Sequence, residues 1–222
     1  MMASAAYDTR RSALETYFDR TARDAWEKLT SDAPVSGIRA TVRAGRDAMR
    51  ATIMNWLPAD MSGLRLLDAG CGTGALAVEA AARGAHVVAI DVARNLVDVA
   101  RNRAPAGLSI EWHAGDMLSS DLGTFDHIVS MDSLIHYHTA DVIAAVEALR
   151  ARARTSVIFT VAPRTPALTA MHSIGLLFPR GDRAPAIVPV AESRLRSAFD
   201  VQRAQRISSG FYKSHAFEVH AA

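Results

Sequence analysis

The chain has 222 residues, of which 50% are hydrophobic and 22% charged, a composition typical of one soluble globular domain or one domain with an appendage. Its formal net charge of +2 argues against nucleic acid as a partner, and no run of about 18 apolar residues predicts a transmembrane helix. The single cysteine, Cys71, excludes an intrachain disulfide. We therefore expect a cytoplasmic protein with at most peripheral membrane contact.

Two helices are predicted before the first strand. Between residues 10 and 56, apolar residues recur at spacings near 3.6 on both sides of the turn-forming segment 31–37. Pro58 ends the second helix, because proline cannot continue one. We interpret residues 1–58 as an N-terminal helical arm that acts as a lid, and residues 59–222 as the core.

From residue 62 the pattern alternates between short apolar runs and helical segments, which favours a parallel sheet covered on both faces. A helix over “VAESRLRSAF” and two strands around residues 208–210 predict a closing hairpin at the sheet edge. Residues 164–189 interrupt the pattern, and we interpret them as an insertion with a short helix at about 166–177. The five earlier strands are predicted in “LRLLDAG”, “AHVVAID”, “LSIEWHAGD”, “TFDHIVSMDSL” and “TSVIFTVAP”.

A glycine-rich loop, “DAGCGTG”, follows the first of these strands and opens a helix. Gly70, Gly72 and Gly74 let the backbone turn tightly and approach a ligand, and the helix start offers unpaired N–H groups. Asp91 ends the next strand, about 20 residues later, where a carboxylate can accept both ribose hydroxyls. The loop therefore predicts a ribose-bearing ligand.

The identity of that ligand depends on the glycine order and on Asp68. A dinucleotide site expects G-x-G-x-x-G, whereas this loop reads G-C-G-T-G. Asp68 adds negative charge that suits a cation, and S-adenosylmethionine carries a sulfonium and an ammonium group. The alternatives are a nicotinamide-dependent oxidoreductase, which the glycine order disfavours, a non-catalytic cofactor-binding protein, and purely structural glycines and aspartates.

Four stretches resemble, in order, the motifs of the class I S-adenosylmethionine-dependent methyltransferases: “LLDAGCGTG”, “VVAIDVA”, “HAGDML” and “FDHIVSMDSLIHY”. The resemblance implies an α/β, Rossmann-like fold with a seven-stranded, mostly parallel sheet and an antiparallel C-terminal edge hairpin. It implies that Asp116 accepts a hydrogen bond from the adenine amino group and that the Met117 backbone N–H donates one to the adenine ring. The implied cofactor-binding residues are Asp68, Gly70, Gly72, Gly74, Asp91, Val92, Asp116, Met117 and Met131.

Other stretches resemble the magnesium-protoporphyrin IX O-methyltransferases of bacteriochlorophyll and chlorophyll synthesis. They are “YFDRTARDAWEKL”, “VSGIRATVRAGR”, “DSLIHY”, “APRTPAL” and “IGLLFPRGDRAP”. The chain departs from that pattern in “TARDAW”, which lacks an expected glycine, and at Arg46, where histidine is expected.

The resemblance implies methyl transfer from S-adenosylmethionine to one propionate of magnesium-protoporphyrin IX, giving the monomethyl ester. Magnesium then arrives only within the porphyrin, and the magnesium chelatase large subunit is an implied partner at the photosynthetic membrane. No histidine spacing predicts a metal site in the protein itself. The alternative acceptor is another small carboxylate or hydroxyl compound.

A propionate needs no strong base, because its pKa of about 4.5 leaves it ionised at neutral pH. Catalysis then requires alignment and the exclusion of water. The resemblance points to His136, beyond the fourth strand, which hydrogen-bonds the propionate or instead caps the following helix. Tyr17 either lies in an apolar stripe or reaches the reacting groups from a closed lid. Arg39 and Arg43 share a helix face and either clamp a carboxylate or are solvated.

The insertion is the predicted porphyrin wall. Its apolar side chains offer a flat surface for the macrocycle, and its arginines suit the second propionate. The plainer alternative is a helix packed on the sheet with solvated arginines. The predicted substrate-binding residues are Arg164, Met171, Ile174, Phe178 and Arg180.

Overall fold

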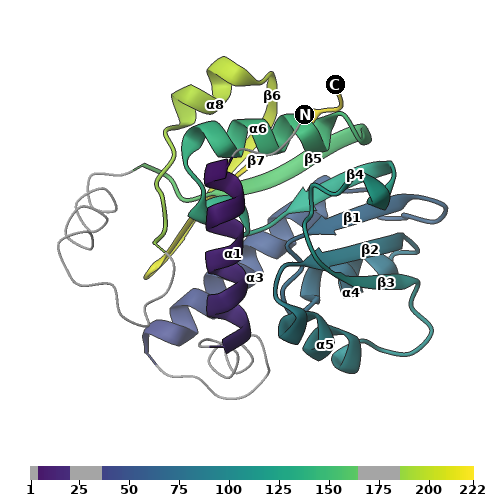
Figure 1. Cartoon of the computed structure of the whole chain (residues 1–222). Coiled ribbons are helices and arrows are strands. Elements are labelled where there is room, and N and C mark those ends of the chain that lie inside the picture. The colour runs from purple at the N-terminus through teal and green to yellow at the C-terminus, as the bar shows by residue number, and fades with distance from the viewer. Residues whose placement is uncertain (1–4, 21–36, 165–185) are drawn as a thin grey trace.

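The computed structural model describes residues 5–20, 37–164 and 186–222 (Figure 1). The described strands are β1 (Arg65–Ala69), β2 (His86–Asp91), β3 (Ile110–Ala114), β4 (Phe125–Ser130), β5 (Ala153–Val161), β6 (Val201–Ser209) and β7 (Tyr212–His220). They form one sheet in the order β3-β2-β1-β4-β5-β7-β6. The first five are parallel, and β7 runs antiparallel to β5 and β6. The predicted sheet and its closing hairpin are confirmed.

The helices also follow the predicted order. Leu57 caps the second N-terminal helix just before Pro58, as expected, whereas the first helix begins earlier than predicted. The short helix predicted at about 166–177 lies outside the described residues. The described helices are α1 (Ala5–Arg20), α3 (Ile38–Trp56), α4 (Ala75–Ala82), α5 (Arg94–Arg103), α6 (Thr139–Arg150) and α8 (Glu192–Ala198), with short 3-10 turns η1 (Ser120–Leu122) and η2 (Leu134–His136).

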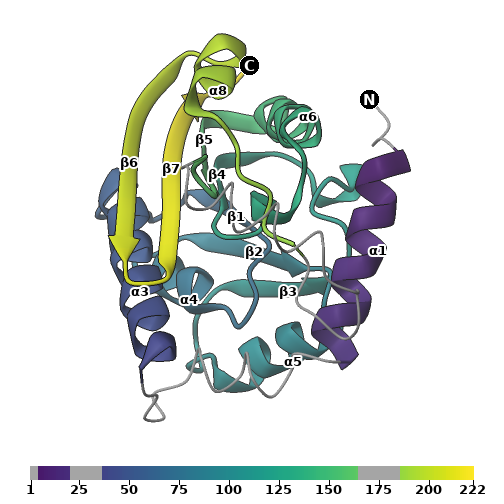
Figure 2. The same ribbon diagram turned by 90° about the vertical axis from the view of Figure 1, so that its left-hand side faces the viewer.

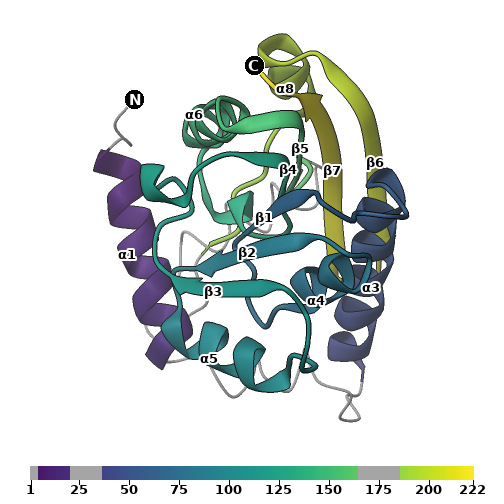
Figure 3. The same cartoon turned by 90° about the vertical axis from the view of Figure 1, so that its right-hand side faces the viewer.

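Apolar layers cover both faces of the sheet. Leu66 of β1 packs in a cluster with α3 and α4, whereas its neighbour Leu67 packs in a second cluster with α6 and α8. This is why the strands read as continuous apolar runs, since successive side chains point to opposite faces and both faces are buried. Figures 2 and 3 show α6 and α8 on the other side of the sheet from α3 and α4.

The two N-terminal helices have different positions. α3 packs against β6, β7 and α4 and buries Met49, Ile53 and Met54, so it shares the core of the sheet. α1 instead stands across the carboxyl ends of β2 and β3, where the predicted lid would lie (Figures 2 and 3). The division of the chain at residue 58 stays a prediction.

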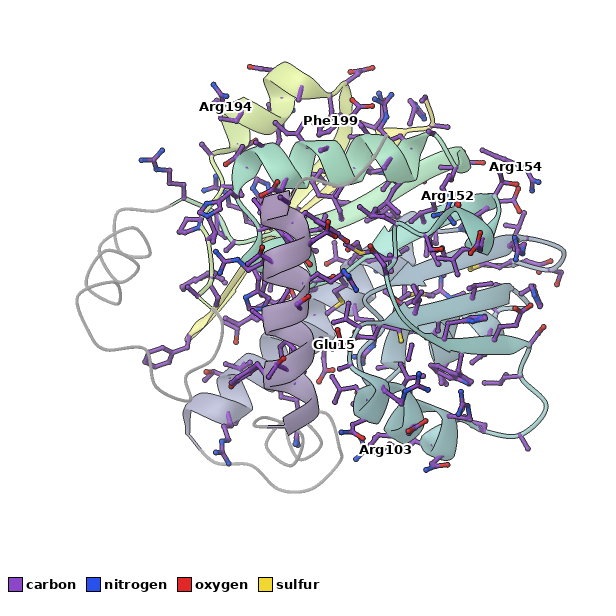
Figure 4. All side chains as sticks on the ribbon, in the orientation of Figure 1. Glu15, Arg103, Arg152, Arg154, Arg194 and Phe199 are labelled. Atoms are coloured by element: carbon purple, nitrogen blue, oxygen red, sulfur yellow. The ribbon has the colours of Figure 1, made fainter. Side chains whose placement is uncertain are left out.

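The opposite ends of the strands carry two arginines, of which Arg154 is exposed and Arg152 is half-buried. Arg154, at the start of β5, forms an ion pair with Asp126, and the Arg152 guanidinium lies over the Phe125 ring. Figure 4 places both arginines well apart from α1. We expect the functional site at the other end, where the carboxyl ends of the strands lie.

Gly74 provides a test of the loop that follows β1. It has a φ of 80°, and an added Cβ would overlap the Trp112 ring and lie 2.9 Å from the Ala100 Cβ. We predict that Gly74→Ala lowers the free energy of unfolding by about 2–4 kcal/mol, from backbone strain plus overpacking. Gly107→Ala is the matched control, because Gly107 also has a positive φ but has nothing within 4 Å of such a Cβ. Urea unfolding of both variants tests this, and equal losses would contradict the packing argument.

Candidate active site

A pocket opens at the carboxyl ends of the central strands, under α1. The space within it is roughly 650 Å³ when its open mouth is included. Of the predicted cofactor residues, Gly70, Gly72, Asp91, Val92, Met117 and Met131 line it. Asp68, Gly74 and Asp116 are not among the lining residues. Six of the predicted residues therefore lie together around one pocket, and their role in binding the cofactor stays a prediction.

Backbone hydrogen bonds fix the glycine loop against β2. The N–H groups of Gly70 and Cys71 donate to the Ile90 carbonyl oxygen at 2.8 and 3.0 Å. Asp91 then receives the Gly72 N–H on Oδ2 and the Ala93 N–H on Oδ1, both at 2.9 Å. The carboxylate predicted to bind a ribose is thus held in place by the loop itself.

Asp68 is a buried carboxylate whose hydrogen bonding is incomplete. It is 1% exposed, and its Oδ2 has no hydrogen-bond partner among the described residues. Burial raises the pKa of Asp68 to about 7, and the nearby charge of Asp91 adds to the rise, while the Ala77 N–H opposes it. A buried acceptor without a donor is costly, so the arrangement fits a cationic group that supplies the missing contact.

Asp116 anchors α1 to the sheet. The Tyr7 hydroxyl donates to Oδ1 at 2.8 Å, the Leu118 N–H donates to the same oxygen at 2.9 Å, and the Arg11 Nε lies 3.7 Å from Oδ2. Tyr7 also stacks on Tyr137, with ring centroids 4.9 Å apart. The role expected for Asp116, binding the adenine amino group, stays a prediction, because α1 occupies its carboxylate here.

Tyr7 is a site residue that the sequence reasoning missed. It lines the pocket together with Leu14 and Phe18, and these three residues recur at helical spacing along α1. That stripe was visible in the sequence, but the predicted helix began too late to include Tyr7. Tyr17, the predicted catalytic residue, packs edge-on against Phe18 and is not among the lining residues. Its catalytic role stays a prediction.

A second ion pair was also missed. Asp132 lies two residues after the end of β4, and its Oδ2 accepts a hydrogen bond from Arg46 Nη1 of α3 at 2.9 Å. The Tyr212 hydroxyl donates to the same carboxylate at 3.0 Å. Arg46 and Asp132 both line the pocket. By contrast, Arg39 and Arg43, the arginines considered as a clamp, are not in its lining.

His136 lies in the pocket wall, as predicted. It is 8% exposed, its Nδ1 lies 3.4 Å from the Ala186 carbonyl oxygen, and its ring is 6.2 Å from that of Phe18. The alternative capping role has no support in the geometry, because His138 occupies the N-cap of α6 and no side chain bonds there.

The predicted porphyrin wall is described only at its two ends. Arg164 is exposed, and its N–H donates to the Val190 carbonyl oxygen at 3.0 Å. The Val188 N–H donates to the Ile135 carbonyl oxygen at 2.8 Å, next to His136. The two described ends of the insertion therefore lie beside each other, and the second end adjoins η2. The remaining predicted substrate residues lie outside the described part of the chain: Met171, Ile174, Phe178 and Arg180.

Comparison with known proteins identifies the family. A “Magnesium-protoporphyrin O-methyltransferase” of Rhodobacter capsulatus is 46% identical over 217 residues, which is 96% of this chain and 97% of that protein. The chain belongs to the magnesium-protoporphyrin O-methyltransferase family. A relative of the same name from Synechocystis is 30% identical, covering 98% of this chain and 99% of the relative.

Family descriptions and a solved structure agree with this membership. Residues 130–221 match “Magnesium-protoporphyrin IX methyltransferase C-terminus”, and residues 66–155 match “Methyltransferase domain”. The crystal structure of magnesium protoporphyrin IX methyltransferase from Synechocystis PCC 6803 with bound SAH is similar, with 28% identity and a TM-score of 0.86. That similarity covers 96% of this chain and all of the solved one. Within the described residues, no helix has the length and apolar character to span a bilayer.

The raised pKa of Asp68 generates a stability prediction for the ligand-free protein. Because the folded pKa lies above the unfolded value of 3.8, the folded state binds more protons between about pH 4 and pH 7. The contribution of Asp68 to stability therefore falls as the pH rises through that window. Asp68→Asn removes the dependence, and we predict that it stabilises the ligand-free protein by roughly 1–3 kcal/mol at pH 8 relative to the wild type.

Urea unfolding at pH 4 and pH 8 measures this difference. The control is Asp98→Asn, because Asp98 is exposed on α5. A gain of the same size at both pH values would show that Asp68 is not the titrating group.

Proposed function

We propose that this protein transfers the methyl group of S-adenosylmethionine to one propionate of magnesium-protoporphyrin IX, giving the monomethyl ester and S-adenosylhomocysteine. The observation that carries the proposal is similarity, over nearly the full chain, to two relatives named for this activity. The pocket supplies the chemical support, because it combines a glycine loop with a ribose-type carboxylate, and the buried acceptor Asp68 lies in β1 just before that loop.

The residues present fit the co-substrate. Asp68 offers an unsatisfied buried oxygen to the ammonium group, and Asp91 stands at the end of β2 for the ribose hydroxyls. Val92 and Met117 would border the adenine, and Met131 the methionine part. S-adenosylmethionine supplies a methyl group on a positively charged sulfur.

The acceptor chemistry requires positioning rather than a strong base. His136 would hydrogen-bond the propionate or hold a stray proton at a ring nitrogen. Three residues of α1 would exclude water from the pocket, because they form its α1 side: Tyr7, Leu14 and Phe18. We retain Tyr17 as the second proposed catalytic residue and the insertion as the porphyrin wall. Cooperation with the magnesium chelatase large subunit and peripheral contact with photosynthetic membranes rest on the family resemblance alone.

The test of the proposal is a methyl-transfer assay with product identification. The purified protein is incubated with methyl-labelled S-adenosylmethionine and magnesium-protoporphyrin IX, and the porphyrin is analysed by mass spectrometry. We expect one labelled methyl group on the macrocycle, released as methanol on ester hydrolysis. Binding of S-adenosylmethionine without a methylated porphyrin would contradict the proposed acceptor. Tight binding of a nicotinamide dinucleotide instead would support the oxidoreductase alternative.

His136 gives a matched pair of variants for the same assay. We predict that His136→Asn lowers kcat by about 100-fold, the lower end of what a positioned proton-transfer group contributes. His138→Asn is the control, because His138 is exposed two residues away and should leave kcat unchanged. Equal kcat values for the two variants would remove His136 from the mechanism.

A further inference from the structure

Asp132 has a backbone conformation that side chains rarely adopt. With a φ of 55°, it is the one non-glycine residue with positive φ in the described part of the chain. Such strained conformations persist only where surrounding contacts hold them, and they concentrate at functional sites. Asp132 lies two residues after β4 and lines the pocket, so we look for the reason for its conformation in the site itself.

Donors from three directions hold the Asp132 carboxylate. Its side chain is only 5% exposed. Tyr212 and Ser214 of β7 donate hydroxyl hydrogen bonds at 3.0 and 3.3 Å, and Thr160 of β5 donates another at 3.3 Å. The Asp132 N–H in turn donates to the Thr160 hydroxyl at 2.7 Å. Three neutral donors already serve this carboxylate, so its hydrogen bonding does not by itself require the arginine.

Arg46 is the fourth partner, and it reaches the carboxylate from α3, which packs against β7. Among the described lining residues it is the one arginine or lysine. A guanidinium presents N–H donors in a planar fork, and Nη1 of this one donates to Asp132. The effect of this ion pair is to fix the orientation of a cation at the pocket surface.

The position of the Arg46 guanidinium in the pocket indicates which end of the proposed co-substrate it would contact. In the sheet order β3-β2-β1-β4, Asp132 follows β4 at one end of the row, and Met117 follows β3 at the other. The proposed adenine side is therefore the far side from Arg46. The near side is bounded by Gly70, Ser133 and His136, where the methionine part and the reacting groups would meet.

We propose that Arg46, positioned by Asp132, binds a ligand carboxylate in this pocket. This inference rests on the proposed function, which offers two sources of that group. The first is the α-carboxylate of the methionine part, which the location of Arg46 favours, and the second is the propionate of the acceptor. Both suit the planar fork of a guanidinium, which recognises carboxylates through paired hydrogen bonds.

Calorimetric titration with two nucleosides separates the two sources. S-adenosylhomocysteine carries the α-carboxylate, whereas 5′-methylthioadenosine lacks the amino-acid part. We expect Arg46→Gln to weaken S-adenosylhomocysteine binding by about 10- to 100-fold and to leave methylthioadenosine binding unchanged. Arg46→Lys should recover part of the loss, because it keeps the charge without the fork. Arg50→Gln is the control, because Arg50 lies one turn further along α3, pairs with Glu79 and is not among the lining residues.

The second arm measures KM for magnesium-protoporphyrin IX at saturating S-adenosylmethionine. A 10-fold or larger rise in this KM for Arg46→Gln, with S-adenosylhomocysteine binding unchanged, assigns the propionate as the bound carboxylate. If neither quantity changes, the inference is overturned while the proposed function stands. If the wild-type protein itself does not bind S-adenosylhomocysteine, the proposed function is contradicted, and the inference that rests on it is contradicted with it.

Asp132→Asn tests the positioning role. Asparagine tolerates the left-handed backbone and keeps hydrogen bonds but lacks the charge. We expect a smaller loss of affinity than in Arg46→Gln and no further loss in the double variant Arg46→Gln/Asp132→Asn, because Asp132 acts through Arg46.

The double variant also separates binding from folding. Arg46→Gln leaves a buried carboxylate without its cation and should lower Tm, whereas the neutral double variant should regain Tm and still bind weakly. Additive losses of affinity in the double variant, or affinity that recovers together with Tm, would overturn the proposed coupling.

Discussion

Four aspartates stand at the carboxyl ends of four adjacent parallel strands, and the organisation of the site depends on what each one binds. Asp68 ends β1 against the start of α4, and Asp91 ends β2 and holds the glycine loop. Asp116 follows β3 and binds α1, while Asp132 follows β4 and binds α3 and β7. The carboxyl ends of parallel strands are not covered by the sheet itself. Here each carboxylate accepts hydrogen bonds from a different covering element, which holds that element over the strand ends.

The same carboxylates give the pocket its chemical character. Two of them have their oxygens occupied by protein donors from distant helices, which fixes Tyr7 and Arg46 in the wall. Asp68 retains an unsatisfied oxygen and a raised pKa, so it opposes stability in the empty protein and suits a cationic ligand. Asp68 thus lowers the stability of the folded protein at the position where a cationic ligand would bind, as is common at functional sites.

The sequence predicted the parts of the site that are local in the chain. The alternating pattern predicted the strands, and the short spacing from the glycine loop predicted that Asp91 lies beside that loop, because both depend on residues close in the chain. The contacts of Tyr7 with Asp116 and of Arg46 with Asp132 span 109 and 86 residues. No local pattern encodes such pairs, since they form only once the sheet order brings β3 and β4 beside helices from the N-terminal arm. The packing of α3 against the sheet likewise depends on residues far away in the chain, so the sequence pattern alone did not show it.

Hydrogen exchange of α1 tests most directly whether these carboxylates hold the covering elements in place. Asp116→Ala removes the acceptor for Tyr7 and the ion pair with Arg11, and Asp121→Ala changes an exposed carboxylate nearby. The account predicts that α1 amides exchange at least 10-fold faster in Asp116→Ala, with the β1 and β4 amides unchanged and Asp121→Ala like the wild type. Unchanged protection of α1 in Asp116→Ala would show that apolar packing alone holds the helix, and would contradict the account.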